Sequence, residues 1–485
     1  MRSVLVVVAT VAACDGAPNM DVDAGVDGRA IDASIDAALG IDGTWLDTYL
    51  TVNGPVSMSV CGSAPTAIVV DQTTAAVTPY TGACKGDGSW RINAPGNLGT
   101  YYLRVQGSLY ETTKHAGIDL STDRLGRNDV GAVAGVNLDF TMTGLDAWAS
   151  GDVLMAFGAN IGFYQNLSFS TGGPTTGGTT LVGTAPWFGY KVDAAKSDQL
   201  QIVQLGVHST TNGLSYLSLD RAYDVPAFTM TNNGTHTIGG TLTGAPPGTL
   251  ALDVNVSSFN QFATVANPNV ASRTIAGSAY AAASAEVLPS PSLISFARDS
   301  SSVSALDFGT LGYGDPFPTA WQRYVKIQEA FAVPYTWNNV TGSLNAQMTR
   351  TMTKAEAEAT VIDAKLGPPQ NPTFDGVDAF TATNISPVPI ITWDAPSLGT
   401  PTDYDVLVYE VQISGTALKF ISTLRLSTKQ TSVRIPAGYL LGQRQYVFVI
   451  RARTRDNSDL YMTPLRSGKS TSTAETLTAL VTTDS

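Results

Sequence analysis

In the stretch Tyr446-Val-Phe-Val-Ile-Arg-Ala452, the large apolar residues Tyr, Phe and Ile alternate with Val, Val and Arg. Successive side chains of a β-strand point to opposite faces, so Tyr446, Phe448 and Ile450 would lie together on one face. We expect that face to be buried, and we predict a β-strand over this stretch.

The same alternation recurs elsewhere in the chain. It is strict at 136–142 and at 250–256, and from Trp45 onwards short apolar runs are separated by Gly, Pro, Asn and Asp. Strands separated by such turn residues are typical of β-sandwiches. We therefore predict an all-β protein made of tandem β-sandwich modules.

The composition agrees with an exported all-β protein. Charged residues make up 14% of the chain, against roughly 25% in an average soluble protein, so Thr, Ser, Asn and Gly must cover much of the surface. Of the 40 acidic residues 33 are Asp, which favours turns and caps over helix interiors. The formal net charge of −12 repels phosphate backbones and argues against nucleic-acid binding.

Two motifs near the C-terminus carry a family resemblance. Ile390-Ile-Thr-Trp393 places a tryptophan in an apolar strand, and Leu440 stands six residues before Tyr446. The second spacing is typical of a tyrosine corner, in which the tyrosine hydroxyl bonds to the backbone upstream. On these motifs, residues 367–477 resemble a fibronectin type III domain.

The resemblance implies a two-sheet sandwich in which Trp393, Phe448 and Ile450 share the core. It also implies a spacer or a general binding platform. Gly367-Pro368-Pro369 would mark the boundary before this module, and residues 478–485 would form a tail after it.

The N-terminus has the features of an export signal. Arg2 precedes an apolar run over 3–13 that is too short to span a bilayer. The run ends in Val11-Ala-Ala-Cys14, which resembles the lipobox of a bacterial lipoprotein signal peptide. The resemblance implies that residues 1–13 are removed and that Cys14 carries a lipid anchor. The alternative is an ordinary signal peptide and a freely secreted protein.

Residues 14–44 are predicted to be a flexible acidic tether. From residue 15 onwards this segment carries seven aspartates against one arginine and has no aromatic residue. Such a segment buries too little apolar surface to order itself, and its charges repel one another. Calcium binding is the sharper alternative, but the run 21–28 lacks the aspartate and glycine spacing of an EF-hand loop.

Cys61 and Cys84 fall in the first module, 45–128. Because the chain is expected to be exported, a disulfide is favoured over two free thiols, and two cysteines with no nearby His make no zinc site. Asp87-Gly-Ser-Trp90, followed by Tyr101-Tyr-Leu-Arg-Val105, resembles the turn and paired strands of prealbumin-like carboxypeptidase regulatory modules.

The central region, 129–366, is predicted to be β-rich. Thr141-Met-Thr-Gly144 and Thr241-Leu-Thr-Gly244 lie one hundred residues apart and suggest two similar sandwich units in tandem. Thr353-Lys-Ala-Glu356 has the spacing of a capping box, so a short helix and a continuing strand are both open over 355–364.

The sequence contains no complete catalytic motif. Its three histidines lack metal-ligand spacing, and there is no HExxH motif, no GxSxG elbow and no phosphate loop with its Lys-Ser/Thr. The few glutamates offer no diagnostic pair for glycoside hydrolysis. We therefore expect no cofactor and no metal site.

Two aromatic clusters are the candidate ligand-binding surfaces. Rings among Gly and Pro can form a flat face on which a sugar or a peptide stacks, and an aspartate beside them can accept hydroxyl hydrogen bonds. The alternative is that the rings fill seams between modules. The candidate residues are Trp187, Phe188, Tyr190, Tyr313, Asp315 and Trp321.

Together these features predict a lipoprotein of a bacterial cell envelope, at the outer membrane or cell surface, or otherwise a secreted protein. Its expected partners are the membrane, through the lipid, and an extracellular protein or glycan, with no nucleic acid. The expected function is non-enzymatic adhesion, scaffolding or ligand binding. The rival is a secreted polysaccharide or ester hydrolase with its catalytic residues in 129–366.

Overall fold

The computed structural model describes residues 40–96, 98–456, 458–466, 468 and 471–485. Within these residues almost every regular element is a β-strand, and the three α-helices are four to six residues long. The all-β, sandwich-type fold is therefore confirmed. Cys14, the signal segment 1–13 and the tether as far as residue 39 lie outside the described residues.

The N-terminal module begins at β1 (Ile41–Thr44), which pairs with β6 (Ser89–Ile92) and β9 (Ile118–Asp119). The prediction that residues 41–44 belong to the tether is wrong. These residues alternate buried and exposed, and Ile41 joins the core of the module. The other strands of the module are β2 (Leu46–Thr51), β3 (Gly54–Ser59), β4 (Thr66–Val70), β5 (Val77–Cys84), β7 (Tyr101–Val105), β8 (Ser108–Thr112) and β10 (Asp123–Leu125).

The first central unit is a complete sandwich. One sheet has the order β14–β15–β11–β18 and the other β13–β12–β16–β17, and their facing side chains form one core. Its elements are β11 (Val136–Thr143), β12 (Val153–Gly158), η1 (Ala159–Ile161), β13 (Phe163–Asn166), β14 (Thr171–Gly172), β15 (Thr180–Trp187), η2 (Ala194–Lys196), β16 (Gln201–Ser209), β17 (Ser215–Asp224), β18 (Thr235–Thr241) and β19 (Thr243–Gly244). The predicted strand at 136–142 is confirmed.

The two Thr-x-Thr-Gly segments do not mark two units in tandem. The first ends strand β11, and the second runs from Thr241, the last residue of β18, into β19; β11 and β18 lie parallel and adjacent in one sheet of this sandwich. The hydroxyl oxygens of Thr143 and Thr241 are 2.9 Å apart. The similarity therefore reflects two neighbouring strand ends within a single sandwich.

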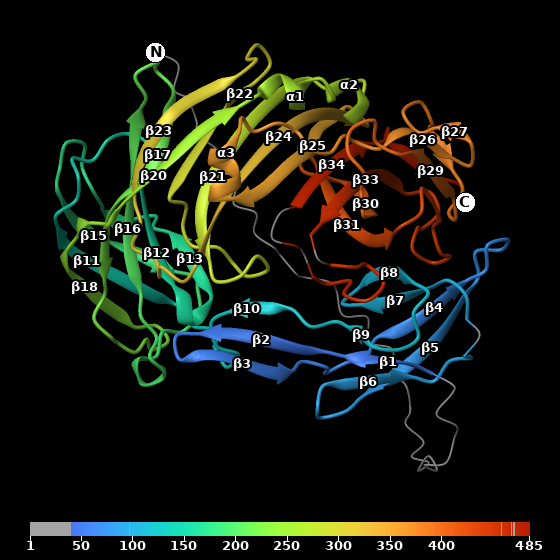
Figure 1. Ribbon diagram of the computed structural model, residues 1–485, viewed down its shortest axis with the longest axis horizontal. Helices are drawn as coiled ribbons and strands as arrows, with labels where there is room; N and C mark the ends of the chain where they lie inside the picture. The colour runs from blue at the N-terminus through green and yellow to red at the C-terminus, as the bar shows by residue number, and fades with distance from the viewer. Residues whose placement is uncertain (1–39, 97, 457, 467, 469–470) are drawn as a thin grey trace.

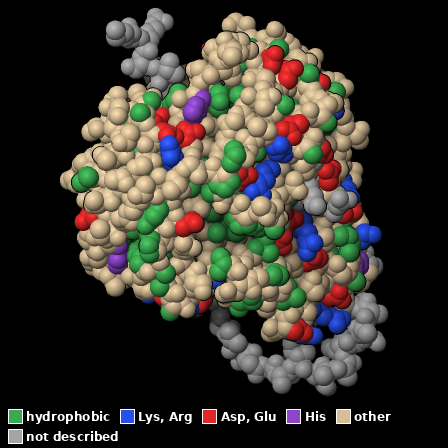
Figure 2. Space-filling model, turned by 60° about the vertical axis from the view of Figure 1, so that its left-hand side comes forward, with side chains coloured by type: hydrophobic (Ala, Val, Ile, Leu, Met, Phe, Trp, Pro, Cys, Tyr) green, Lys and Arg blue, Asp and Glu red, His purple; other side chains and the backbone are tan. Residues whose placement is uncertain are grey.

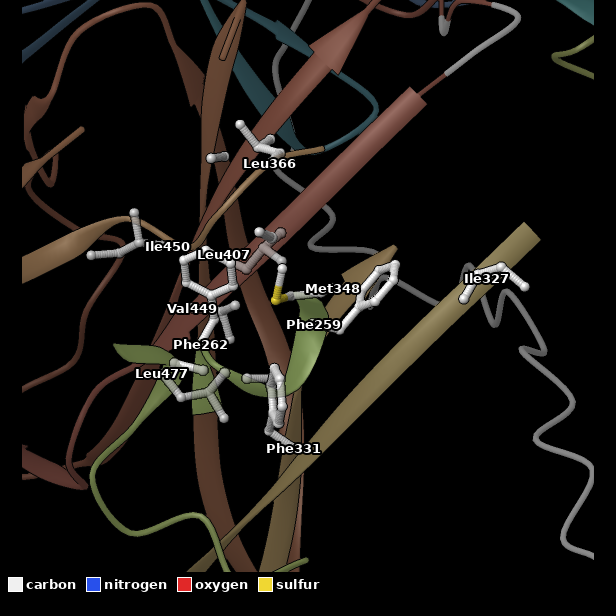
Figure 3. Packing of buried hydrophobic residues seen from close by; sticks show 14 of the residues in the cluster. Phe259, Phe262, Ile327, Phe331, Met348, Leu366, Leu407, Val449, Ile450 and Leu477 are labelled. Atoms are coloured by element: carbon white, nitrogen blue, oxygen red, sulfur yellow. The ribbon is translucent and has the colours of Figure 1, made fainter. Parts of the chain in front are cut away.

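The second central unit places a two-stranded sheet over a larger one. Buried side chains of β20 (Pro247–Val254) and β23 (Leu306–Gly314) join one core with those of β21 (Ser272–Ala282) and β24 (Gln322–Trp337). Phe259 and Phe262 enter the same core (Figure 3). The remaining elements are α1 (Val256–Asn260), α2 (Ala263–Ala266), β22 (Ile294–Asp299), β25 (Val340–Thr353) and α3 (Lys354–Ala359).

Helix α3 answers the question that the sequence left open at 355–364. The side chain of Thr353 accepts from the backbone of Glu356, and the side chain of Glu356 accepts from the backbone of Thr353. This reciprocal capping box satisfies two donors at the helix start. A short helix therefore forms, not a continuing strand.

The C-terminal module is a two-sheet sandwich with the order β27–β26–β29–β32 facing β31–β30–β33–β34. The hydroxyl of Tyr446 accepts a hydrogen bond of 2.9 Å from the backbone of Leu441, as a tyrosine corner requires. Trp393, Phe448 and Ile450 are buried. The strands are β26 (Gln370–Phe374), β27 (Val377–Asp378), β28 (Asn384–Ile385), β29 (Ile390–Asp394), β30 (Asp403–Ser414), β31 (Ala417–Thr428), β32 (Ser432–Arg434), β33 (Gln445–Arg455), β34 (Thr471–Leu477) and β35 (Val481–Thr483).

The prediction of a tail at 478–485 is wrong for its middle part. Strand β35 pairs with β33 and with β28, and Val481 and Thr483 are almost fully buried. Val481 and Thr483 are buried, while Thr482 between them is partly exposed, as expected for a strand with one face against the sandwich.

One hydrogen-bonded sheet passes through all the modules. Its strand order is β13–β12–β16–β17–β22–β21–β24–β25–β34–β33–β30–β31–β8–β7–β4–β5–β6–β1–β9. The modules are therefore joined edge to edge (Figure 1). The C-terminal module is not a separate spacer, because both edges of its larger sheet are paired with other modules.

The N-terminal module closes the arrangement by contacting the first central sandwich and the C-terminal module (Figure 1). At the first joint, the backbone of Val52 donates to the side chain of Asn160 over 3.2 Å. At the second, the loop between β33 and β34 inserts Leu460 into the N-terminal core, where it is 2% exposed. Arg466 of the same loop pairs with Asp119 at 2.7 Å.

Candidate functional site

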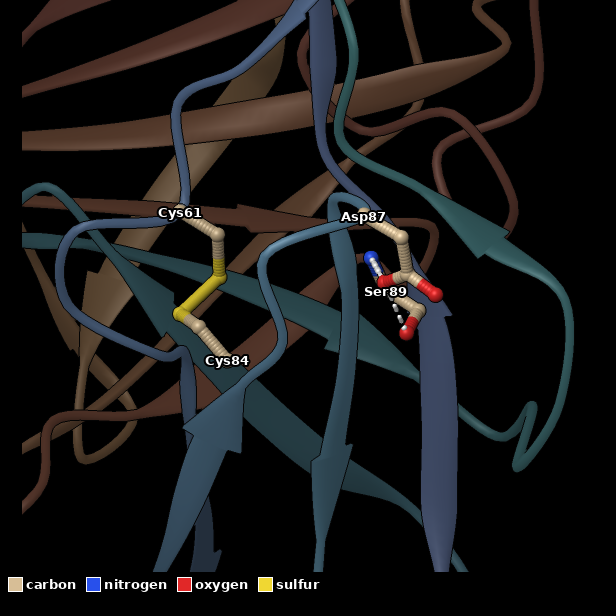
Figure 4. The surroundings of a disulfide bond; sticks show 4 residues. All are labelled: Cys61, Cys84, Asp87 and Ser89. Atoms are coloured by element: carbon tan, nitrogen blue, oxygen red, sulfur yellow. Dashed lines mark hydrogen bonds between the residues drawn. A yellow bond between two sulfur atoms is a disulfide. The ribbon is translucent and has the colours of Figure 1, made fainter.

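Cys61 and Cys84 form a disulfide, as predicted, with their Cα atoms 5.7 Å apart. The bond lies near the turn that precedes β6, in which Asp87 accepts from both the backbone and the hydroxyl of Ser89 (Figure 4). Gly88 adopts a φ of +85° in that turn, which favours glycine. The disulfide is thus a structural tie within the N-terminal module.

The first aromatic cluster is divided between core and surface. Trp187 is 2% exposed, and its indole nitrogen donates to the carbonyl of Tyr190 over 2.9 Å. Phe163 packs edge-on against both rings. Only Phe188 and Tyr190 expose large parts of their side chains, so Trp187 has no face on which a ligand could stack.

The second aromatic cluster fills a seam between the two central units. Phe157 of β12 packs edge-on against Phe317 and Trp321, and Tyr313 is buried in the same core. The Arg323 guanidinium occupies both carboxylate oxygens of Asp315 at 2.8 Å. In this cluster the rings fill a seam between modules, as the alternative interpretation expected. Asp315 is paired with Arg323 and is not free to accept a hydrogen bond from a ligand through an unpaired oxygen.

A histidine, an aspartate and a serine meet on the first central sandwich, but not in the order of a catalytic triad. His208 lies 2.9 Å from Asp220, and this hydrogen bond raises the pKa of the histidine. The hydroxyl of Ser218 donates to Asp220 over 2.7 Å. A nucleophilic serine must donate to the histidine, so this cluster lacks the relay of a hydrolase.

Metal-binding geometry is likewise absent from the described part of the chain. Among residues 40–485 as described, no group of three or more His, Cys, Asp or Glu side chains is placed to hold a metal ion. His115 instead contacts the carbonyl of Leu98, and His236 accepts from the backbone of Thr231. These two histidines therefore have local structural contacts.

The sequence interpretation missed a buried charged surface on the larger sheet of the C-terminal module. Pairing places Asp405 opposite Arg451, and Arg451 opposite Glu475. Since paired residues of neighbouring strands share a face, these side chains form one row. We call this surface the charged face. Its ionic residues are Asp403, Asp405, Arg425, Arg451, Arg453, Arg455 and Glu475.

Asp405 is the centre of the charged face. It is fully buried and contacts Arg453 at 2.9 Å and Arg425 at 3.1 Å, while the hydroxyl of Ser427 donates to it over 2.6 Å. Burial by itself would raise the pKa of Asp405, but the attraction of the arginines outweighs burial and holds the pKa well below 3.8. The carboxylate is therefore ionised and fully paired.

A cavity of about 250 Å³ opens on the charged face. Its walls come from the first half of β25 and from β30, β33 and β34. They combine amide, hydroxyl, aromatic, aliphatic and ion-paired side chains. The lining residues are Ser343, Leu344, Asn345, Gln347, Leu407, Tyr409, Val449, Arg451 and Glu475.

A signal for this surface was present in the sequence. Arg451, Arg453 and Arg455 stand at a period of two, which places them on one face of a strand if the predicted strand 446–452 continues to residue 455. Asp403 and Asp405 have the same period in the strand beside it. The sequence alone does not show that this polar face is covered, since alternation is typical of strands with one wet face.

A second buried carboxylate lies on the other face of the same sheet. Glu329 of β24 is fully buried among apolar residues, and the hydroxyl of Ser300 donates to one of its oxygens. The other oxygen has no hydrogen-bond partner among the described residues. Burial raises the pKa of Glu329 to about 7. Apart from the Ser300 hydroxyl, no side chain of the described residues lies within hydrogen-bonding distance of Glu329, so no histidine or second acid accompanies it.

The exposed surface is low in charge, in agreement with the composition. Figure 2 shows that uncharged polar side chains and backbone cover most of the visible face, and that basic side chains lie mainly beside acidic ones. Within the described residues, no helix is long and apolar enough to cross a membrane.

Comparison with known proteins gives no family assignment. No family model matches the chain, and no curated protein matches it. A structure of the chicken CNTN1 FN1-FN3 domains matches 73% of this chain and 99% of its own length, with 10% identity and a TM-score of 0.14. A streptococcal ancillary pilin matches 63% and 95%, with 9% identity and a TM-score of 0.12.

A third solved structure is Escherichia coli alpha-2-macroglobulin in its native conformation. It matches 87% of this chain but 27% of its own length, with 11% identity and a TM-score of 0.12. TM-scores this low carry no argument about this chain, so the fold assignment rests on its own strands and their pairing.

Proposed function

We propose that this protein is a lipoprotein of a bacterial cell envelope that binds an extracellular ligand without catalysing a reaction. The cavity on the charged face carries this proposal. It combines unpaired polar side chains with an aromatic ring and a smaller aliphatic surface, so it offers more polar groups than the mostly apolar sites of drug-sized ligands and suits a small polar ligand. The lipobox resemblance at Val11–Cys14 supports the anchor.

The arrangement of the modules supports a binding or scaffolding role. A continuous sheet and two joints of the N-terminal module hold the modules in fixed positions. A binding site built on strands is held more rigidly than a site on loops. We further propose that the first module belongs to the prealbumin-like class and the last to the fibronectin type III class.

The hydrolase rival has no arrangement that favours it in the described residues. Ser218 donates to Asp220 and not to His208, and Glu329 is enclosed in an apolar core. We therefore keep binding as the function and treat turnover as the outcome that would contradict it.

Two measurements on the native protein test the proposal. Intact-mass analysis and palmitate labelling should show a chain that begins at Cys14 and carries lipid, and Cys14→Ser should lose the label. Incubation with glycan and ester substrates should give binding without turnover. A full-length unlipidated chain, or turnover that is lost on substitution within 129–366, would contradict the proposal.

A further inference from the structure

The cavity on the charged face exists because β25 crosses over the C-terminal sheet. Its second half pairs with β34, while its first half contacts β31. A Cβ added to Gly342 would lie 2.8 Å from the Cβ of Leu418, so glycine permits the close approach of the two strands. The space between β25 and the charged face is the cavity, and the exposed side chains of Ser343 and Asn345 lie at its open rim.

The charged groups of the cavity neutralise each other. Arg451 contacts Glu475 at 2.6 Å, and the backbone of Gln347 donates to the other carboxylate oxygen of Glu475 over 2.8 Å. Asp405, next to this pair, is satisfied by Arg425 and Arg453. A charged ligand would have to break these pairs or be buried without a counter-ion, which is costly. The cavity therefore favours a neutral ligand.

The remaining polar groups are free to bind hydroxyls. Among the described residues, the side chains of Ser343, Asn345 and Gln347 and the hydroxyl of Tyr409 have no hydrogen-bond partner. Amide groups both donate and accept, so they suit a ligand rich in hydroxyl groups. Such a ligand would complete hydrogen bonds that the protein leaves open.

The other walls are apolar. Leu344, Leu407, Val449 and the ring of Tyr409 present aliphatic and aromatic surface to the same space. A pyranose has apolar C–H faces and hydroxyl groups around its edge, so it complements both kinds of wall. The volume of about 250 Å³ is below the range of drug-sized sites, which limits the occupant to a single ring.

We propose that this cavity binds one neutral pyranose unit of a glycan, an inference that rests on the proposed ligand-binding function. Gln347 and Asn345 bind the hydroxyl groups, and Tyr409 covers an apolar face of the ring. Arg451 and Glu475 position the cavity wall. The remaining N–H groups of Arg451 donate to the hydroxyl groups at the edge of the sugar, and the remaining lone pairs of Glu475 accept from them.

Titration of the full chain with methyl glycosides tests this inference. The probes are the methyl pyranosides of glucose, galactose, mannose and N-acetylglucosamine, with glucuronate as the charged comparison, and the readout is saturation-transfer NMR. We expect at least one neutral glycoside to bind, and glucuronate to bind at least about tenfold more weakly, since its charge has no free partner.

Variants of the lining residues locate the site. Gln347→Met and Asn345→Ala should each raise the dissociation constant by about tenfold, the effect of losing one good hydrogen bond. Gln328→Met is the matched control, because Gln328 lies on the same face of the neighbouring β24 but does not line the cavity. It should leave the affinity unchanged, and thermal unfolding of each variant checks that the fold is intact.

Three results would overturn the inference. If no neutral glycoside binds, the ligand is not a sugar of this class. If glucuronate binds as tightly as the neutral probes, the cavity does not select for a neutral ligand. Unchanged affinity in folded Gln347→Met and Asn345→Ala removes the site. If a glycan or a protein still binds elsewhere on the chain, the proposed ligand-binding function survives these failures. If no ligand of either kind binds, that function fails with them.

Discussion

The sheet that joins the central and C-terminal modules has two buried faces of opposite chemistry. On β33, Tyr446, Phe448 and Ile450 face an apolar core, while Arg451 and Arg453 face the charged surface. The first face is lined mainly by apolar side chains, whereas the second pairs its charged side chains with one another. The difference shows that alternation along a strand indicates two faces with different environments. It does not indicate which of the two faces is exposed to solvent.

A fully buried carboxylate on each face, Asp405 on the charged face and Glu329 on the apolar face, responds to burial in the opposite way. Asp405 has three arginines near it, and its pKa lies well below 3.8. Glu329 has mainly apolar neighbours and one serine hydroxyl, and burial outweighs the weaker attraction of Arg273, so that its pKa rises to about 7. Burial favours the neutral form of a carboxyl group, and only close cations reverse that preference.

The largest expected effect is at Asp405. Replacement by Ala leaves the partly buried Arg425 and Arg453 without their counter-charge and should lower the free energy of unfolding by about 3 to 5 kcal/mol. Urea unfolding at pH 7 measures it, with Asp405→Asn as the comparison. If the Asp405→Asn variant were as stable as the wild type, the stability at this position would depend on shape and hydrogen bonding and not on charge.

Phe448→Ala probes the apolar face of the same strand. Phe448 is fully buried and packs edge-on against Phe374 at 4.9 Å between ring centroids. Loss of the ring leaves a cavity and should cost about 3 to 4 kcal/mol. Because no titrating group is removed, the loss measured by urea unfolding should be the same at pH 5 and at pH 8. A loss that varied with pH would mean that the two faces are coupled.

Glu329→Gln should reveal a pH dependence on the apolar face. The folded protein keeps the proton of Glu329 up to a pKa of about 7, whereas the unfolded chain releases it near the ordinary value of 4.5. Stability from this group is therefore complete below pH 4.5 and is lost as the pH rises towards and through 7. At pH 8 the Gln variant should be more stable than the wild type by an amount on the order of 2 to 3 kcal/mol.

Unfolding free energies of the wild type and the Glu329→Gln variant at pH 4.5 and pH 8 test this prediction. The two proteins should have similar stability at pH 4.5 and differ at pH 8. The contribution of Asp405 to stability depends on pH in the opposite direction. Its lowered pKa gives stability that is present above pH 3.8 and is lost as the pH falls below that value. A constant difference between the two proteins across this range would contradict the assignment of a raised pKa to Glu329.

The smallest expected effect is at the tyrosine corner. Tyr446→Phe keeps the buried ring but leaves the backbone N–H of Leu441 without its acceptor, and should cost about 1 kcal/mol. Thermal and urea unfolding measure this loss. A change near zero would indicate that water replaces the hydroxyl at this position.

The local elements were predictable from the sequence because they depend on near neighbours. Alternation predicted the strand at 136–142, and the spacing of Leu440 and Tyr446 predicted a hydrogen bond to the backbone upstream. The pair Cys61 and Cys84 followed from the expectation of export. These features are set by side-chain period, turn chemistry and the parity of the cysteines.

The cavity and the joints were not predictable because they depend on distant pairings. Met348 of β25 lies opposite Ala474 of β34, and Leu109 of β8 lies opposite Leu426 of β31. A single sequence gives no information about which strand edges meet. The candidate rings of Trp187 and Tyr313 were visible in the sequence, but their burial was not.

Insertion of Leu460 into the N-terminal core has a consequence for how the chain acquires its structure. The first module lacks its neighbouring strand until β31 at 417–428 has been made, and it lacks the apolar side chains of Leu460, Tyr461 and Leu465 until the loop after β33 has been made. Contacts between such distant positions slow folding, because a long loop must close before they form. A fragment of the chain that ends before residue 460 would therefore contain an N-terminal module with an incomplete core, and this module could complete its folding only after that part of the chain had been synthesised.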